Sequence, residues 1–287
     1  MPSYRTTARG LLLLLLLGVF CGTANAAVPR LAFPVVGNIS FTNDYGAPRP
    51  GGWHQGNDIM ARWRAPAIAA EHGKVEVHTG STLGTCMLYL RGASGYTYVY
   101  IHLNNDLTAR SEDSGGCKQG VAYAPGLRTG DYVRKGELLG YVGDSGDAEN
   151  GMDHLHFEIR KNGTPQNPYN HLLAARRVLY PKPATLDPIW LLLKGTVRSV
   201  TADSLEVTVG KVRMSNGWRF YYTRRVTLAL SGETVYQQSS SSGVVASSSA
   251  GVKPGDAVRV WTTNFAPTWQ TQVANPGVLA AHTVRTG

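Results

Sequence analysis

Short strand-type segments separated by turn residues dominate the first part of the chain, and they restrict the folds that it can adopt. Between residues 27 and 180, each apolar or alternating segment is only a few residues long and is soon followed by Gly, Asn, Asp or Pro. Such segments predict β-strands, which we expect at KVEVH, CMLYLRG, YTYVYIHL, YVRKGELLGYVG and HLHFEIR. A helix is expected only around residues 170–178. The sequence therefore predicts a mainly β fold.

The character of the sequence changes after the proline-rich segment YPKPATLDP, which predicts a linker over residues 181–190. Beyond it, SLEVTVG and DAVRVWTT alternate apolar and polar residues, as half-buried antiparallel strands do. Residues 239–251 (SSSSGVVASSSAG) have low complexity and predict a flexible loop. We expect residues 191–287 to form a small, accessory β-barrel-like domain without catalytic residues. His282 stands alone there and is expected at the surface.

The first 26 residues have the three parts of a secretory signal peptide. Arg5 and Arg9 precede seven consecutive leucines, and small residues at Ala24 and Ala26 supply a cleavage site. The apolar run is too short to span a membrane as a helix. We therefore expect residues 1–26 to be removed on export, which leaves no transmembrane anchor.

The chain is basic, with a formal net charge of +9, and loss of the two signal-peptide arginines leaves +7. The basic residues do not gather in one run, so the chain lacks the basic arm typical of nucleic-acid binding. A diffuse basic surface suits an anionic polymer, either nucleic acid or an anionic cell envelope. Charge alone does not choose between the two.

The mature chain would keep two cysteines, Cys86 and Cys117. In an oxidising compartment we expect a disulfide between them, closing the base of the polar, Gly-rich loop Asn104–Gly126. Two unpaired buried thiols are the alternative. The cysteine count excludes a cysteine-rich zinc site.

Two short motifs place possible metal ligands close together. On a strand, His154 and His156 of MDHLHFEIR would project from the same face, although an isolated pair of this kind also occurs by chance on solvated strands. In HQGNDIM, His54 and Asp58 flank Gly56, which lets the backbone turn so that both side chains can reach one metal.

A third motif, YVYIHL, adds another histidine. We expect Tyr98, Tyr100 and His102 to share one face of a strand. The three motifs together supply five candidate side chains, His54, Asp58, His102, His154 and His156. Two imidazoles and one carboxylate around zinc leave a fourth position for water, as in catalytic zinc sites. The remaining histidines could then transfer protons near neutral pH.

The motifs HQGNDI, YIHL and HLHFEIR, in this order, resemble those of the lysostaphin-type (LytM-like, β-lytic) zinc metalloendopeptidases, which cut peptide cross-links in bacterial peptidoglycan. The segment from Gly130 to Pro168 also follows the family's pattern, and the resemblance covers about Trp53–Leu172. It implies an antiparallel β-sheet or sandwich metallopeptidase domain over residues 27–180 and one Zn²⁺ per chain. It also implies secretion or a place in the bacterial cell envelope, and peptidoglycan peptide stems or cross-bridges as the substrate.

The resemblance also implies a role for each candidate residue. His54, Asp58 and His156 would be the zinc ligands, whereas His102 and His154 would activate water and stabilise the tetrahedral oxyanion. Family members often carry a tyrosine before the first ligand, and the nearest tyrosine in this chain is nine residues ahead, at position 45.

Three alternatives compete with a zinc-dependent endopeptidase. The chain could be a catalytically silent wall-binding module or an activator of other wall hydrolases, as some relatives are. The tetrapeptide GDSG around Ser145 is also found in trypsin-like serine proteases, but the family places a Gly-rich turn there. Nucleic-acid binding lacks any base-reading motif, so we expect no nucleic acid as partner. Which peptide bond is cut is not specified by the sequence.

Overall fold

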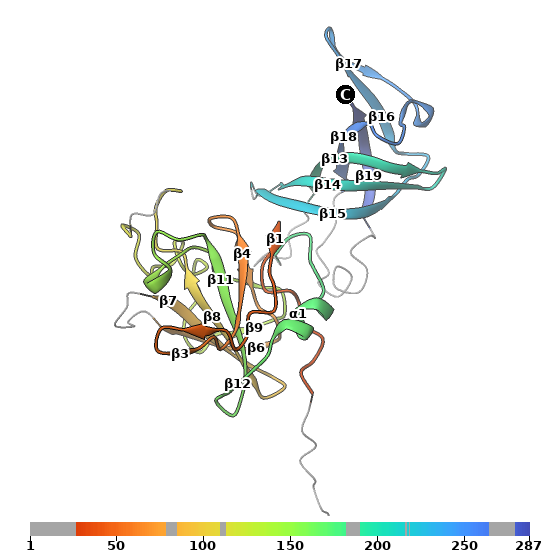
Figure 1. Ribbon diagram of the computed structural model, residues 1–287. Coiled ribbons are helices and arrows are strands. Elements are labelled where there is room, and N and C mark those ends of the chain that lie inside the picture. The colour runs from red at the N-terminus through yellow and green to blue at the C-terminus, as the bar shows by residue number, and fades with distance from the viewer. Residues whose placement is uncertain are drawn as a thin grey trace, which may run out of the picture.

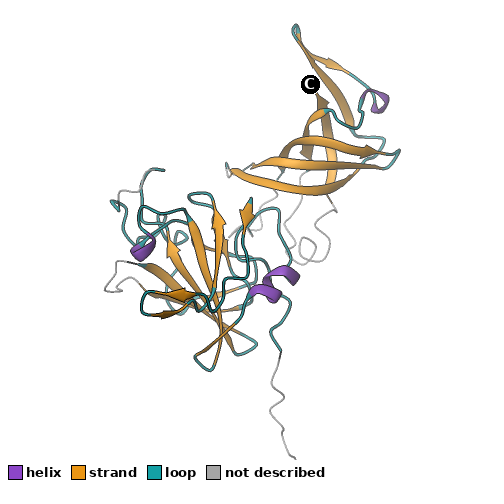
Figure 2. Cartoon of the chain, in the orientation of Figure 1, coloured by secondary structure: helices purple, strands orange, loops and turns teal. Residues whose placement is uncertain are grey.

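The computed structural model describes residues 27–78, 85–109, 113–181, 190–215, 217, 219–263 and 279–287. Within these residues the chain is mostly antiparallel β-structure, as predicted, and it forms two β-rich parts (Figures 1 and 2). The predicted signal peptide and most of the predicted linker lie outside the described residues. Among the helices of these ranges, none has the length and apolar character needed to cross a membrane.

The first part is built on an eight-stranded sheet with the order β1-β4-β11-β8-β7-β6-β9, to which β12 adds by pairing with β11. Its strands are β1 (Ile39–Ser40), β4 (Asn57–Ala61), β6 (Gly73–His78), β7 (Cys86–Gly92), β8 (Tyr96–Leu103), β9 (Tyr132–Val133), β11 (His154–Lys161) and β12 (Thr164–Gln166). Every pair in this sheet is antiparallel.

Smaller elements surround this sheet. Two two-stranded sheets pair β2 (Pro48–Arg49) with β3 (Gly52–Trp53), and β5 (Pro66–Ile68) with β10 (Leu138–Tyr141). The short helices are η1 (Gly146–Ala148) and α1 (Tyr169–Ala174).

Two predicted elements differ from the observed ones. The expected helix is present but shorter, because α1 ends at Ala174. The segment YVRKGELLGYVG is not continuous: a turn at residues 134–137 separates β9 from β10, and these strands pair in different sheets. Gly136 has φ +89°, a conformation that interrupts a strand and that glycine adopts without strain.

The core of the first part lies on the face of the sheet opposite the histidines. Leu155, Phe157 and Ile159 of β11 are fully buried, and the ring of Phe157 packs against those of Tyr98 and Tyr100. Burial of each such side chain contributes about 1.5–3 kcal/mol. The same alternation that fills the core therefore fixes which side chains of β11 face outward.

The second part is a seven-stranded sheet with the order β15-β14-β13-β18-β19-β16-β17. Because β15 also pairs with β19, five of its strands form a closed ring of pairings. The strands are β13 (Leu191–Val200), β14 (Ser204–Met214), β15 (Arg219–Ala229), β16 (Val235–Ser240), β17 (Gly243–Ala246), β18 (Ala257–Thr262) and β19 (Leu279–Thr286).

The prediction of a flexible loop over residues 239–251 is wrong in part. Gly243–Ala246 is strand β17, paired with β16 in a hairpin, and η2 (Ser249–Gly251) follows. Main-chain pairing with β16 outweighs the serine-rich composition here, and the valines of β17 remain about half exposed. His282, expected at the surface, is exposed on β19.

The two parts contact each other. Val36 and Ile68 from the first part belong to the same apolar cluster as the core of the second. The guanidinium carbon of Arg62 lies 3.9 Å from the centroid of the Tyr221 ring on β15, and the carbonyl oxygen of Tyr221 lies against Gly37. The domain boundary predicted near residue 180 therefore lies beside the apolar contact between the two parts.

Candidate metal centre

The cross-strand register of β4 and β11 brings the first two candidate ligands together. His156 lies directly opposite Asp58, and His154 lies opposite Met60. Directly opposed residues of an antiparallel pair project from the same face. The carboxylate of Asp58 therefore meets the imidazole of His156, and His154 stands beside them.

Gly56 lets the backbone that precedes β4 pass close to β11, next to Asp58 and His156. A Cβ atom there would lie 2.5 Å from the carbonyl oxygen of Phe157 and 2.8 Å from Nε2 of His156. Only glycine lets the backbone pass so close to β11. This close approach places His54 next to Asp58 and His156.

Three atoms converge at the centre. Nε2 of His54 lies 3.0 Å from Oδ1 of Asp58 and 2.8 Å from Nδ1 of His156, which is itself 3.0 Å from Oδ1 of Asp58. All three residues are buried. In a tetrahedral zinc site with ligand bonds of about 2.1 Å, ligand atoms lie roughly 3.4 Å apart. The observed cluster has nearly this size.

The outer hydrogen bonds set the tautomer of each ligand candidate. Nδ1 of His54 donates to the carbonyl oxygen of Asp44 at 2.9 Å, and Nε2 of His156 donates to Oε1 of Glu158 at 3.1 Å. The inner nitrogens, His54 Nε2 and His156 Nδ1, then carry lone pairs that face the Asp58 carboxylate. Three lone pairs directed at one point fit a metal cation, and the two imidazoles and one carboxylate fit zinc.

Electrostatics keep the carboxylate of Asp58 charged. Burial alone would raise its pKa, but the neighbouring His156 and His54 side chains outweigh burial and hold the pKa far below its usual range. Nη2 of Arg49 donates to the second carboxylate oxygen of Asp58 at 2.6 Å. The pKa of Glu158 is likewise lowered against the effect of burial, by hydrogen bonds from His156 and Arg160.

The side chain of His102 also lines this groove, although the alternation of strand β8 predicts that it points to the opposite face. Tyr98 and Tyr100 point into the core, where they are fully buried, whereas His102 lines the groove with His154. The expectation that the three share one face is therefore wrong. The register between β7 and β8 shifts near the end of β8, and His102 has φ +60°. This bulge turns its side chain to the other face.

Backbone carbonyls orient both additional histidines. Nδ1 of His102 donates to the carbonyl oxygen of Ser145, and Nδ1 of His154 donates to that of Met152, each at 2.8 Å. Each ring thus keeps a lone pair on Nε2, and the ring centroids lie 4.8 Å apart. Burial lowers the pKa of His102 to about 4, so this imidazole is neutral at pH 7.

The structure excludes the serine-protease alternative. Ser145 is fully buried, and its hydroxyl accepts a hydrogen bond from the backbone NH of Cys86 at 3.0 Å. It therefore positions His102 and β7 and cannot reach a substrate. The hydroxyl of Tyr45 donates to the carbonyl oxygen of Pro165, away from the histidines.

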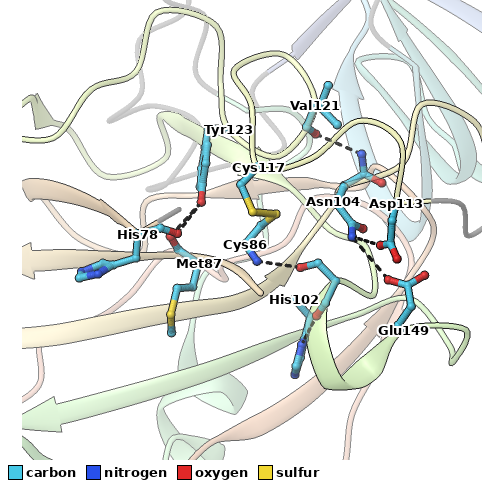
Figure 3. Close-up of a disulfide and its surroundings, with 12 residues drawn as sticks. His78, Cys86, Met87, His102, Asn104, Asp113, Cys117, Val121, Tyr123 and Glu149 are labelled. Carbon is cyan, nitrogen blue, oxygen red and sulfur yellow. Dashed lines mark hydrogen bonds between the residues drawn. A yellow bond between two sulfur atoms is a disulfide. The ribbon is translucent and has the colours of Figure 1, made fainter. Parts of the chain in front are cut away.

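The predicted disulfide is present between Cys86 and Cys117, with Cα atoms 5.2 Å apart (Figure 3). It attaches the loop that follows β8 to the first residue of β7. The groove in front of the centre is lined by η1 and by Trp53 and Met152, two residues that are 69% and 74% exposed.

Sequence reasoning missed three residues that hold the centre. Glu158 could have been found, because it follows His154 and His156 on the same face of β11. Asp44 could not have been found, since it acts on His54 through its backbone carbonyl, a group that every residue has. Arg49 could not either, because no motif links it to Asp58, to which it donates a hydrogen bond.

Comparison with known proteins finds a family model that matches the part of the chain holding this centre. The model of peptidase family M23 matches residues 52–168, which include all five candidate side chains. Residues 52–168 are thus similar to peptidase family M23. This match confirms the predicted resemblance to LytM-like peptidoglycan peptidases.

Two curated proteins are also similar in sequence to this part of the chain. The L-Ala--D-Glu endopeptidase of Bacillus subtilis is 28% identical over 161 residues, which are 52% of this chain and 44% of that protein. The peptidoglycan DD-endopeptidase ShyC of Vibrio cholerae is 27% identical over 140 residues, 49% of this chain and 25% of that protein. The chain thus spans less than half the length of either relative.

Among solved structures, the catalytic domain of the antimicrobial peptidase lysostaphin from Staphylococcus simulans is 26% identical. The match covers 47% of this chain and 93% of that domain, with a TM-score of 0.37.

Proposed function

We propose that this protein is an exported, zinc-dependent endopeptidase that hydrolyses peptide bonds in the stems or cross-bridges of bacterial peptidoglycan. The observation that carries the proposal is the convergence of His54 Nε2, Asp58 Oδ1 and His156 Nδ1, with outer hydrogen bonds that direct lone pairs inward. The names of the two relatives support peptidoglycan peptides as the substrate class.

In this proposal the three converging residues hold one zinc ion. When bound, zinc supplies a Lewis acid that polarises the scissile carbonyl and makes water a better nucleophile at neutral pH. His102 and His154 handle the protons. Because the Nδ1 atom of each ring is held by a carbonyl oxygen, the Nε2 atoms are free to accept a proton from the attacking water.

A protonated ring at either position can then donate a hydrogen bond to the developing oxyanion and return the proton to the leaving amine. Proton transfer by positioned groups of this kind contributes typically 10²–10⁴-fold to a rate. Trp53 and Met152, exposed at the groove, offer apolar surface to a bound peptide. The diffuse positive charge of the chain suits an anionic envelope.

The alternative is a catalytically silent wall-binding module or an activator of other hydrolases. The completeness of the site favours the enzyme, since three ligand candidates and two further histidines line one groove.

The test separates metal binding from turnover. Wild type is expected to contain one zinc per chain by elemental analysis and to release peptide fragments from purified peptidoglycan, detected by mass spectrometry. Asp58→Ala should lose both zinc and activity, because it removes the charged ligand. His154→Ala should keep its zinc but lose at least 100-fold in turnover.

His282→Ala is the matched control, because this histidine is exposed on β19 in the second part of the molecule, and it should match wild type. A wild-type protein that binds zinc and wall fragments but cuts none would establish the silent alternative. Turnover at the wild-type rate by His154→Ala would disprove the role given to that residue.

A further inference from the structure

The net positive charge of the mature chain lies almost entirely in its second part. Residues 191–287 contain ten lysines and arginines but four aspartates and glutamates, a net charge of +6. Residues 27–190 contain sixteen basic and fifteen acidic residues, a net charge of +1. A nearly neutral first part is thus joined to a strongly basic second part.

The register of the second sheet gathers four of these cations into one row. Lys194 of β13 lies directly opposite Lys211 of β14 on one side and Arg259 of β18 on the other. Arg259 in turn lies directly opposite Arg285 of β19. Directly opposed residues project from the same face. Neighbouring strands lie about 4.8 Å apart, so this cationic row is roughly 14 Å long.

The cationic row faces away from the core. The residue next to each cation along its strand is buried in the core of the second part, and these four residues are Leu193, Val212, Val260 and Val284. Because side chains alternate along a strand, the cations point to the outer face. Both lysines of the row are exposed, and both arginines are partly exposed.

No carboxylate balances the row among the described residues. The guanidinium of Arg285 donates to the neutral Oε1 of Gln237 at 2.9 and 2.7 Å. Within the described ranges, none of the four cations forms an ion pair. Like charges directly opposite each other destabilise a sheet. By contrast Arg91, which lies directly opposite Lys74 in the first part, pairs with Glu76 at 2.8 Å. An anion lying across the cationic row would supply the missing balance.

The row continues toward the groove of the proposed metal centre. Tyr221 of β15 lies directly opposite Lys211, whose Nζ is 5.1 Å from the centroid of the tyrosine ring. The guanidinium carbon of Arg62, from the first part, lies 3.9 Å from the same centroid. Arg62 is two residues beyond Met60, which lines the groove. A polymer bound along the row can therefore extend across Tyr221 toward the groove.

We propose that the cationic row binds peptidoglycan through its carboxylates and holds this polymer beside the groove. Peptide stems that repeat along a polymer present carboxylates at intervals, and an extended row of cations suits such a series better than one small anion. The identity of the polymer rests on the proposed function, whereas the row itself concerns binding and not hydrolysis.

The aromatic rings beside the row favour this polymer over nucleic acid. Proteins bind single-stranded nucleic acid by stacking its bases on aromatic side chains. The rings of Tyr221 and Trp261 already contact cations of the row, since the guanidinium carbon of Arg285 lies 4.8 Å from the centroid of Trp261. The row therefore offers charge to its partner rather than open stacking surfaces.

The test measures binding rather than cleavage. The full mature chain carrying His154→Ala, which the proposed function expects to be inactive, is sedimented with purified peptidoglycan. Binding should weaken at least about tenfold between about 50 mM and about 500 mM NaCl, because salt screens exposed charges. A chain that is not a peptidase would give the same result. Failure of this proposal is therefore distinguishable from failure of the proposed function.

A matched pair of double variants locates the surface. Lys194→Gln with Arg259→Gln should weaken binding roughly 10–30-fold, since each lysine or arginine near an anionic surface contributes about a fivefold factor. Lys74→Gln with Arg91→Gln removes the same residue types from directly opposite positions on β6 and β7, and it should bind as tightly as the parent chain. Thermal unfolding checks that both variants fold. The first should not lower the Tm, because it relieves repulsion within the row.

Three outcomes would overturn the proposal. The first is a parent chain that does not sediment with peptidoglycan at low salt. The second is equal binding by the two double variants. The third is tighter binding of single-stranded DNA, or of vesicles of anionic lipid, than of peptidoglycan, with the loss of that binding in the Lys194→Gln and Arg259→Gln variant, since the row would then recognise a different partner.

Discussion

At the scale of single residues, the proposed metal centre depends on where two imidazole protons lie. Asp44 and Glu158 each accept the outer proton of a histidine, and this leaves the inner nitrogens of His54 and His156 unprotonated. Neither the Asp44 carbonyl nor the Glu158 carboxylate faces the point where the three ligand candidates converge. They nevertheless decide whether two histidines 102 residues apart can act as ligands at the same time.

Glu158→Gln should weaken zinc binding about 10–100-fold, the usual effect of changing a partner of a metal-bound histidine. The amide keeps the shape of the side chain and a hydrogen-bond acceptor but removes the negative charge that makes His156 more basic. Competition with a zinc chelator measures the change. Glu76→Gln, at a more exposed position on β6, should have no effect, and equal zinc affinity of both variants would contradict the role of Glu158.

Much of this residue-level arrangement could be predicted. The alternation of HLHFEIR places His154 and His156 on one face, and Gly56 indicates a tight turn between His54 and Asp58. The structure brings all of them together. The outer acceptors could not be predicted equally well, because a backbone carbonyl such as that of Asp44 leaves no mark in the sequence.

At the scale of elements, the end of β8 and the loop after it matter most. The sequence alternates regularly through YVYIHL, yet a bulge and a positive φ turn His102 away from the face of Tyr98 and Tyr100. Positive φ is enriched at histidine but stays uncommon for residues other than glycine, so the sequence alone does not reveal it. Strand positions were therefore predictable here, whereas the direction of the last functional side chain was not.

Removing the disulfide should destabilise the protein without removing its zinc. The double variant Cys86→Ser and Cys117→Ser opens a link between residues 31 apart, and chain entropy gives a loss of about 3–4 kcal/mol in the free energy of unfolding. Denaturant unfolding measures it, with zinc content as the control. Wild type treated with a thiol reductant should match the variant, and an unchanged unfolding midpoint would contradict the expectation.

At the scale of the whole molecule, two sheets share one apolar cluster. Val36 and Ile68 contribute to it from the first part, and Gly37 follows directly against β15. Two β-rich regions were predictable from the change in composition near residue 180. Their contact was not, because it joins residues far apart in sequence that carry no shared motif.

Gly37→Ala should destabilise this contact. Gly37 has φ +121°, and a Cβ atom there would lie 2.9 Å from the carbonyl oxygen of Tyr221. Gly163→Ala is the matched control, since Gly163 has φ +83° and open space around it. Each substitution should cost about 1–2 kcal/mol for the left-handed backbone conformation, and Gly37→Ala should cost more because of the contact with Tyr221. Calorimetric unfolding compares them, and equal Tm values would show that the contact is unimportant.

Ser145 gives the disulfide an influence beyond stability. Its hydroxyl holds the amide of Cys86, while its own carbonyl oxygen holds the ring of His102. Loss of the disulfide would thus act through one buried residue on a histidine that lines the groove. Thiol reagents added to an assay buffer would therefore alter the kinetics being measured, even though no cysteine touches the substrate.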